Sequence, residues 1–241
     1  MASPTPTVED YLGAIYTLSR DQEPVIGRKL ADWMEVSPPT VTATIQRMTR
    51  DGWVLMHDDK TIHLTDAGLE LAAAVVRRHM LTELLLARVL DVPWARVHEE
   101  ADRLEHAMSA DIAARVAELV DNPDLCPHGN PLPGHEQEAE LFVPLLACPV
   151  GGPYVLARVH EEVERNSELM AYLEEHAVVP GSEIRVVAVL PFNETITIET
   201  AKGQVVLGMA VSRYLWVCPV NNHTEAEGGA GRSGAERGDE G

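Results

Sequence analysis

Residues 25–52, VIGRKLADWMEVSPPTVTATIQRMTRDG, decide the fold because they contain two amphipathic helical patterns in tandem. In both patterns the apolar residues recur at helical spacing and are expected to point inward. These residues are Leu30, Ala31 and Met34 in the first helix, and Val41, Ile45 and Met48 in the second. Ser37 stands at the N-cap of the second helix and Pro38 at its first position, where no N–H is needed. The stretch therefore predicts a helix-turn-helix.

The segments on either side extend this motif into a winged unit. VEDYLGAIYTLSR, residues 8–20, has the apolar spacing of a preceding helix. Gly52 ends the second helix of the motif, and two β-rich runs, 53–57 and 61–65, follow with a polar DDK turn between them. Residues 1–71 are thus predicted to form a winged helix-turn-helix DNA-binding domain.

The rest of the chain divides into a helical part and a β-rich part. Helical patterns cover residues 67–90, the stretch that begins at Trp94 and ends at Ser109, and residues 110–120. The predicted segments are a helical metal-binding and dimerisation domain (72–137), a linker (138–152), a small β-barrel (153–220) and a disordered tail (221–241). The predicted fold class is mainly α with a β-containing C-terminal domain.

The composition describes an acidic globular protein. Its 241 residues are 45% hydrophobic and carry a formal net charge of −19, so DNA binding, which depends on clustered Lys and Arg, must be local. Residues 36–50 meet this need because Arg47 and Arg50 stand in a stretch without acids. The three cysteines are too few for a disulfide framework and are expected to be reduced thiols. Without a membrane-length apolar run or a visible secretory signal, a cytoplasmic location is expected.

The segment HEEADRLEH, residues 98–106, carries the strongest chemical signal. Its His and carboxylate side chains at i, i+4, i+7 and i+8 share one face of a helix. They are His98, Asp102, Glu105 and His106. On the preceding helix His79 and Glu83 stand one turn apart, and two antiparallel helices with such pairs can enclose a divalent cation. The flanking Leu104 is expected to face inward, and a solvated face without metal is the alternative.

Five motifs together resemble one known family. They are TVEDYLGAIY, VSPPTVTATIQRMTRDG, RRHMLTELLL, VHEEADRLEHAMS and CPHGNPLPG. The combination is similar to the metal-dependent repressors of the diphtheria-toxin-repressor and manganese-transport-regulator type, and the resemblance covers nearly everything except the tail. It implies a winged helix-turn-helix, a helical dimerisation domain and an SH3-like (FeoA-like) C-terminal domain, and hence a transcriptional repressor rather than an enzyme.

The resemblance also implies two metal sites. The primary site maps to Asp10, Asp102, Glu105 and His106, and the ancillary site to His79, Glu83 and His98. Further ligands are drawn in some relatives from a loop that corresponds to Cys126 and His128, and from a C-terminal carboxylate, for which Glu164 or Glu168 could serve. A metal at the primary site would tie the first helix to the dimerisation domain and so control the recognition helices.

The ligand types favour manganese. Iron-type members carry methionine and cysteine where this chain has Asp10 and Asp102, and hard carboxylates suit Mn²⁺. Fe²⁺ remains the alternative, and Zn²⁺ or Co²⁺ could bind in vitro. Gly13 stands where manganese-type members supply a second carboxylate, which weighs against a tight two-manganese cluster built in that way.

The resemblance implies a homodimer that binds double-stranded, palindromic operator DNA and controls metal-homeostasis genes. The candidate phosphate and base contacts are Thr7, Arg28, Ser37, Pro39, Thr40, Thr42, Ala43, Arg47, Arg50 and Lys60. Two other classes stay open from the residues themselves. One is a metal-dependent hydrolase that uses the His/Asp/Glu cluster, and the other is a winged-helix regulator that responds to no metal.

Overall fold

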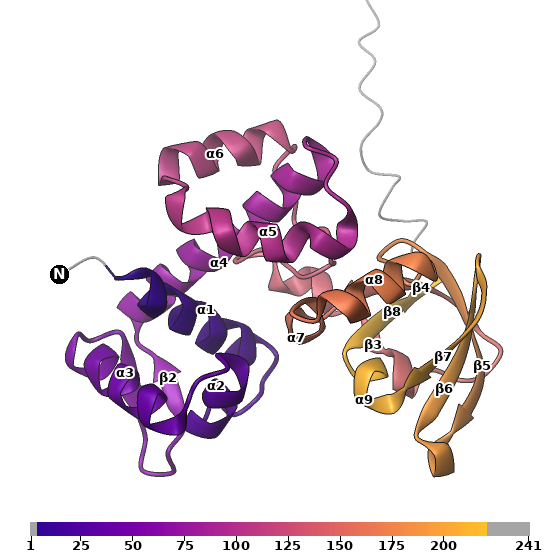
Figure 1. The fold of residues 1–241 in the computed structure, drawn as a ribbon, viewed down its shortest axis with the longest axis horizontal. Coiled ribbons are helices and arrows are strands. Elements are labelled where there is room, and N and C mark those ends of the chain that lie inside the picture. The colour runs from indigo at the N-terminus through magenta and orange to yellow at the C-terminus, as the bar shows by residue number, and fades with distance from the viewer. Residues whose placement is uncertain (1–3, 221–241) are drawn as a thin grey trace, which may run out of the picture. The chain divides into compact units, whose positions relative to one another are not determined.

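The computed structural model describes residues 4–220, so the tail predicted at 221–241 lies outside the described residues. The chain divides into two compact units (Figure 1). Unit 1 comprises Met1–Leu141 and Arg158–Glu175, and unit 2 comprises Phe142–Ala157 and His176–Gly241. Within residues 4–220, no helix is long and apolar enough to cross a membrane.

The first half of unit 1 is the predicted winged helix-turn-helix. Its elements are α1 (Pro6–Arg20), α2 (Gly27–Trp33), α3 (Pro38–Arg50), β1 (Val54–Met56) and β2 (Ile62–Leu64). The inward faces predicted for α1 and α3 are buried, with Leu12, Ile15, Val41, Ile45 and Met48 in one core. The wing is an antiparallel hairpin in which β1 pairs with β2.

Two local contacts define the ends of these elements. Ser37 is the N-cap of α3, as predicted, but its hydroxyl lies 2.8 Å from the Thr40 hydroxyl and makes no capping bond to the backbone. After the wing, Thr65 caps the next helix by accepting a hydrogen bond from the Gly68 N–H at 3.0 Å. A Cβ atom on Gly68 would lie 1.9 Å from the Trp53 carbonyl oxygen, so only glycine allows this close approach.

The second half of unit 1 is helical. It contains α4 (Asp66–Arg88), a short 3₁₀ turn η1 (Trp94–Arg96), α5 (Val97–Leu104), a second turn η2 (Glu105–Ala107) and α6 (Ala110–Leu119). Helix α4 begins beside the wing and packs against α1, α5 and α6, so one helix connects the DNA-binding part with the remaining helices (Figure 1).

The helix predicted to run from Trp94 to Ser109 is not continuous. It ends at Leu104, the tighter η2 follows, and Ser109 caps α6 by accepting from the Ile112 N–H. The prediction that Leu104 faces inward is wrong, because this residue is 47% exposed at the point where the helix ends. Glu105 therefore projects from the 3₁₀ turn rather than from the α-helix that carries Asp102.

Two short helices that follow the strand β4 (Pro153–Val159) also belong to unit 1. These are α7 (Glu161–Glu164) and α8 (Ser167–Glu175), although the sequence prediction assigned them to the C-terminal barrel. The carboxylate of Glu174 on α8 accepts the Trp94 backbone N–H at 3.0 Å. This contact to η1 explains why α8 groups with the helical part.

Unit 2 is built on a six-stranded sheet with the order β3-β8-β4-β5-β6-β7. The strands are β3 (Val143–Pro144), β4 (Pro153–Val159), β5 (Glu183–Leu190), β6 (Thr195–Thr200), β7 (Gly203–Gly208) and β8 (Leu215–Pro219), and α9 (Met209–Ser212) lies between the last two. The segment 138–152 is not a plain linker, because β3 lies in it and pairs with β8. The mainly α fold with a β-containing C-terminal domain is confirmed.

Candidate metal centre

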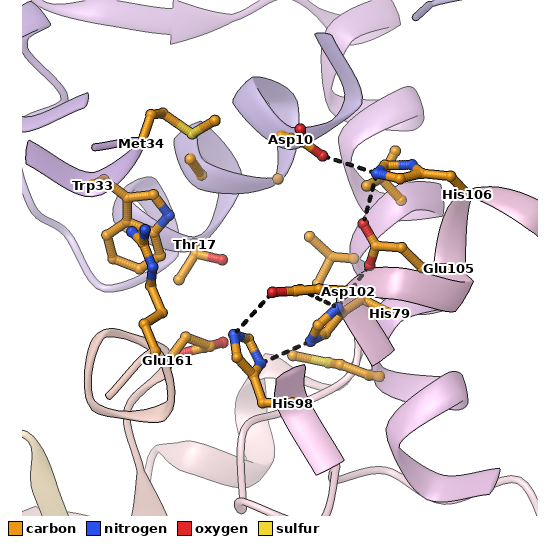
Figure 2. A pocket seen from close by; sticks show the side chains of 16 residues that line it. Asp10, Thr17, Trp33, Met34, His79, His98, Asp102, Glu105, His106 and Glu161 are labelled. Atoms are coloured by element: carbon orange, nitrogen blue, oxygen red, sulfur yellow. Dashed lines mark hydrogen bonds and ion pairs between the residues drawn. The ribbon is translucent and has the colours of Figure 1, made fainter. Parts of the chain in front are cut away.

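The predicted metal ligands on α1 lie close to those on the turn η2, which follows α5. Asp10 lies in the second turn of α1, and its Oδ1 is 3.0 Å from His106 Nε2 on η2 (Figure 2). His106 Nε2 is also 3.5 Å from Glu105 Oε1. The ligand atoms of Asp10, Glu105 and His106 all lie within 4.8 Å of one another. We call this group, with Asp102, the outer cluster.

Asp102 lies at the edge of the outer cluster. Its side chain is 59% exposed, and its Oδ1 lies 3.4 Å from His79 Nδ1. It shares a second convergent group with His79 and Glu105, whose Oε2 is 2.6 Å from the same ring nitrogen. Three carboxylates from α1, α5 and η2 thus converge around two imidazole rings.

Sequence reasoning missed Glu9, which supports the outer cluster. Its Oε2 lies 2.9 Å from His106 Nδ1 and accepts a 2.8 Å hydrogen bond from Arg78 on α4. With Nδ1 bonded to Glu9, the other ring nitrogen of His106 faces Asp10 and is available for ligation. The only signal in the sequence was the position of Glu9 beside Asp10, which does not distinguish it from a solvated acid of the first helical turn.

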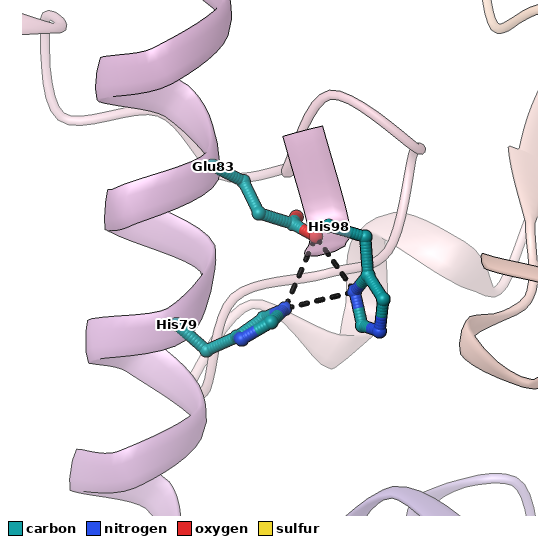
Figure 3. A group of neighbouring side chains, drawn as sticks. All are labelled: His79, Glu83 and His98. Carbon is teal, nitrogen blue, oxygen red and sulfur yellow. Dashed lines mark hydrogen bonds and ion pairs between the residues drawn. The ribbon is translucent and has the colours of Figure 1, made fainter. Parts of the chain in front are cut away.

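A second group, the inner cluster, surrounds Glu83. Its members are Glu83, His98, Cys126, His128 and Glu164, with His79 between the two clusters. Glu83 Oε1 lies 3.1 Å from both His79 Nε2 and His98 Nδ1 (Figure 3). Glu164 Oε2 approaches His98 Nδ1 to 3.0 Å. The sequence had left Glu164 and Glu168 as equal candidates, and the structure brings only the former to the cluster, since Glu168 is exposed at the start of α8.

Two buried atoms of the inner cluster lack a hydrogen-bond partner. They are Glu83 Oε2, on a side chain that is only 1% exposed, and His128 Nδ1, which approaches Glu83 Oε1 and Glu164 Oε2 only to 3.4 and 3.5 Å. Leaving such atoms unsatisfied is unfavourable, and a cation that both could ligate would remove this cost. Nε2 of His128 faces the Trp94 carbonyl at 3.4 Å, which leaves Nδ1 directed at the carboxylates. The residues present therefore fit a divalent cation.

The charges of the metal-free clusters are balanced by protons on histidine. Burial opposes protonation of His98, but hydrogen bonds to Glu164 and Glu83 raise its pKa to about 10. Burial likewise opposes the charged form of His79, yet Glu83 and Glu105 raise its pKa well above the ordinary value. Burial raises the pKa of Asp10, against the attraction of His106. A divalent cation would replace these protons, because metal ligands must be deprotonated.

Cys126 is the only sulfur ligand of the inner cluster among residues 4–220. Burial raises the pKa of its thiol well above the ordinary value, and the neighbouring carboxylates of Glu83 and Glu164 raise it further. Its Sγ converges with Glu83 and His128. A thiolate is therefore disfavoured here unless a nearby positive charge stabilises it.

The candidate DNA contacts lie on the outside of the winged helix-turn-helix. The exposed ones are Thr7, Arg28, Ser37, Pro39, Thr40, Thr42, Ala43, Arg50 and Lys60. Arg47 is half-buried, with Nη2 3.5 Å from the Thr5 hydroxyl. The Thr42 hydroxyl donates to the Pro38 carbonyl at 3.0 Å, so its proton is not available to a phosphate while this bond is made.

Comparisons with known protein families cover nearly all of the described chain. Residues 4–62 match the model of the iron dependent repressor N-terminal DNA binding domain. Residues 65–134 match the metal binding and dimerisation domain of the same repressors, and residues 143–219 match the FeoA domain.

The similar proteins include repressors that are named for iron and others that are named for manganese. The iron-dependent repressor IdeR of Mycobacterium tuberculosis is 35% identical over 212 residues, which cover 80% of this chain and 92% of the relative. The diphtheria toxin repressor of Corynebacterium diphtheriae is 37% identical over 131 residues, 54% of this chain and 58% of the relative. Among solved structures, a manganese-dependent transcriptional repressor in complex with manganese has a TM-score of 0.78 at 32% identity, covering 88% of this chain and all of that one.

Proposed function

Because this chain belongs to the diphtheria-toxin-repressor family of metal-dependent transcriptional repressors, we propose that Mn²⁺ activates it to bind operator DNA and repress metal-homeostasis genes. The family consists of transcriptional repressors and not enzymes, so the hydrolase alternative is set aside. One observation carries the proposal. Asp10 of the DNA-binding part lies 3.0 Å from His106 of the helical part, within reach of one shared cation.

The donor chemistry of the outer cluster supports Mn²⁺ as the activating ion. Asp10, Asp102 and Glu105 offer hard oxygen atoms and His106 offers one imidazole nitrogen. Such oxygen-rich sites suit hard divalent ions, among which Mn²⁺ also accepts an imidazole. A cation supplies the positive charge that allows three neighbouring carboxylates to ionise together.

The inner cluster supports a second metal site. Glu83, His98, Cys126, His128 and Glu164 supply its donors, and the thiol of Cys126 is a softer ligand than any in the outer cluster. Softer donors favour Fe²⁺, Zn²⁺ or Co²⁺ relative to Mn²⁺. This one observation favours the second candidate function, an Fe²⁺-responsive repressor with the same fold and the same ligands.

The residues around the outer cluster explain how ligation would control DNA binding. Arg78 holds the carboxylate of Glu9, and Glu9 orients the ring of His106 toward Asp10. In the metal-free protein, burial raises the pKa of Asp10 and so disfavours the ionised carboxylate that would bridge the two parts. Removing this penalty favours the arrangement in which α1 is fixed against α4 and η2, a two-state element biased by charge.

A homodimer would present two copies of α3 to a palindrome. Exposed apolar side chains on α5 and α6, namely Leu104, Ile112 and Leu119, support a self-association surface in the region that matches the dimerisation model. Two recognition helices related by a two-fold axis read half-sites about 10 bp apart or a multiple of it. Because a repressor acts where its operator DNA lies, we place its action in the cytoplasm.

The proposal is tested by fluorescence anisotropy with DNA from the gene's own upstream region. Protein stripped with chelator is titrated without metal, with Mn²⁺, and anaerobically with Fe²⁺, beside Asp10→Ala and the exposed α4 control Glu70→Ala. Mn²⁺ is expected to raise the affinity at least tenfold in the parent and in Glu70→Ala, and to lose most of this effect in Asp10→Ala. Equally tight specific binding in chelator would select the metal-independent winged-helix regulator instead, and a larger response to Fe²⁺ would select the iron repressor.

A further inference from the structure

A chain of buried polar groups leads from the inner cluster to the end of α1. Asn130 Nδ2 donates to Glu164 Oε1 at 2.6 Å and to the Val159 carbonyl at 2.8 Å. The Asn130 Oδ1 accepts from Arg158 Nε at 2.5 Å. The two terminal nitrogens of Arg158 then donate to Asp21 at 2.9 and 2.8 Å, in a two-pronged contact. Two side chains, Asn130 and Arg158, thus connect a proposed metal ligand with the residue directly after α1.

This relay is enclosed by protein. Asn130 is fully buried, and only 4% of Arg158 is exposed. Buried polar groups need their hydrogen-bond partners, so a change at one end leaves few alternatives for the others. Glu164 divides its two oxygens between the relay and the cluster, because Oε1 accepts from Asn130 while Oε2 faces His98.

The same end of α1 has further contacts with the segment 158–165. His160 Nε2 lies 2.8 Å from Asp21 Oδ2, and Arg20 donates to Glu161 at 2.9 Å. Asp21, His160 and Glu161 converge as metal ligands would, but Arg20 and Arg158 supply the positive charge that these carboxylates require. We therefore read this group as an ion-pair network and not as a cation site.

We propose that Arg158 and Asn130 are positioning residues that couple the inner metal site to the DNA-binding domain through Asp21. The inference rests on the proposed metal-dependent function and extends it. Helix α1 would be fixed at two points: in its second turn at Asp10 by the outer cluster, and about 16 Å away at Asp21 by the relay. A metal bound by Glu164 Oε2 would fix the orientation of this carboxylate. The carboxylate would then orient Asn130, and Asn130 would orient the Arg158 guanidinium that donates to Asp21. By thermodynamic reciprocity, whatever fixes α1 for DNA also raises the metal affinity of the inner site.

The test follows backbone hydrogen exchange at residues 19–22 in the full chain, with chelator and with saturating Mn²⁺. Asp21→Asn removes the negative charge that pairs with Arg158 and keeps the size of the side chain. The matched control is Asp32→Asn on the exposed face of α2. We expect Mn²⁺ to slow exchange at residues 19–22 at least tenfold in the parent and in Asp32→Asn, but not in Asp21→Asn. The affinity of Asp21→Asn for DNA in Mn²⁺ should fall about tenfold.

A second variant acts at the other end of the relay. Glu164→Gln keeps an oxygen that can accept from Asn130 but is a weaker metal ligand, so exchange in chelator should match the parent while the effect of Mn²⁺ at residues 19–22 is lost. If either variant destabilises the fold, exchange in chelator rises as well, and the ratio of exchange in chelator to exchange in Mn²⁺ is then compared with that of the parent.

The outcomes separate the relay from the proposed function. If the parent protein shows metal-dependent DNA binding and both variants keep full metal-dependent protection at residues 19–22, the relay is refuted while the function stands. If the parent itself shows neither response to Mn²⁺, the proposed function fails and the relay with it. A merely structural role of Asp21 would raise exchange equally with and without metal, and this result also refutes the coupling.

Discussion

Replacing Glu161 by glutamine should weaken the fold by an amount that depends on pH. Burial alone would raise the pKa of this carboxyl, but Arg20, Arg158 and His160 lower it from 4.5 to about 2. A carboxyl whose pKa is lower in the folded than in the unfolded state stabilises the fold above its unfolded value and loses this contribution as the pH falls through the folded value. Glutamine resembles the protonated carboxylic acid, so Glu161→Gln isolates this contribution.

The size of the effect follows from the two pKa values. The difference between 4.5 and about 2 corresponds to a stabilisation on the order of 3 kcal/mol at neutral pH. By the same linkage relation, less than about half of this stabilisation remains at pH 3. The stability deficit of Glu161→Gln should thus be constant between pH 6 and 7 and should shrink steadily below pH 4.5.

Urea unfolding of the metal-free protein, followed by tryptophan fluorescence in chelator, measures this deficit at each pH. The neighbouring Glu162→Gln is the control, since Glu162 is exposed and should differ from the parent by under about 0.5 kcal/mol throughout. A Glu161→Gln protein as stable as the parent at pH 7 would refute the reasoning. So would a deficit that persists unchanged at pH 3, because it would indicate lost packing rather than lost charge pairing.

Three further substitutions test other parts of the structure. Glu9→Gln removes the charged acceptor that orients His106 and should weaken Mn²⁺ binding at the outer cluster about 10–100-fold, as measured by calorimetric titration against the control Glu70→Gln. Cys126→Ser removes the one sulfur ligand of the inner cluster and should lower Zn²⁺ affinity more than Mn²⁺ affinity in competition dialysis. Gly68→Ala would place a Cβ atom 1.9 Å from the Trp53 carbonyl oxygen, so the free energy of unfolding should fall by about 1–3 kcal/mol in thermal unfolding. An unchanged melting temperature would contradict the close approach.

Local sequence patterns predicted the winged helix-turn-helix well, because its helices are marked by apolar spacing and capping residues that lie close together in the sequence. Apolar spacing identified α1 and α3, and Pro38 marked the first residue of α3. The same reasoning failed at Leu104, because periodicity does not reveal where a helix tightens into a 3₁₀ turn. It also failed for segment 138–152, where β3 is too short to show alternation and exists through its pairing with β8.

The sequence predicts the ligands of the candidate site only where they are spaced one or two turns apart on a single helix. His79 and Glu83 are one turn apart on α4, and a pattern search finds such pairs. Glu164 and Asn130 are 34 residues apart in the sequence and meet only through the packing of α7 on the loop after α6, so no local signal could choose Glu164 over Glu168. Long-range polar contacts of this kind are specified by the whole fold.

His79 connects the two clusters, and the chemistry of its ring limits how they can be filled. Its Nδ1 lies 2.6 Å from Glu105 Oε2, and its Nε2 lies 3.1 Å from Glu83 Oε1. A neutral imidazole has one nitrogen with a free lone pair, because the other nitrogen carries the proton. His79 can therefore ligate a cation in one of the two clusters but not in both. When Nδ1–H donates to Glu105, the lone pair of Nε2 points at the inner cluster, and Oε1 of Glu105 remains directed at His106. Glu105 then belongs to the outer cluster as a ligand and to the inner cluster as the acceptor that fixes the tautomer of His79, so the two sites depend on each other through one hydrogen bond.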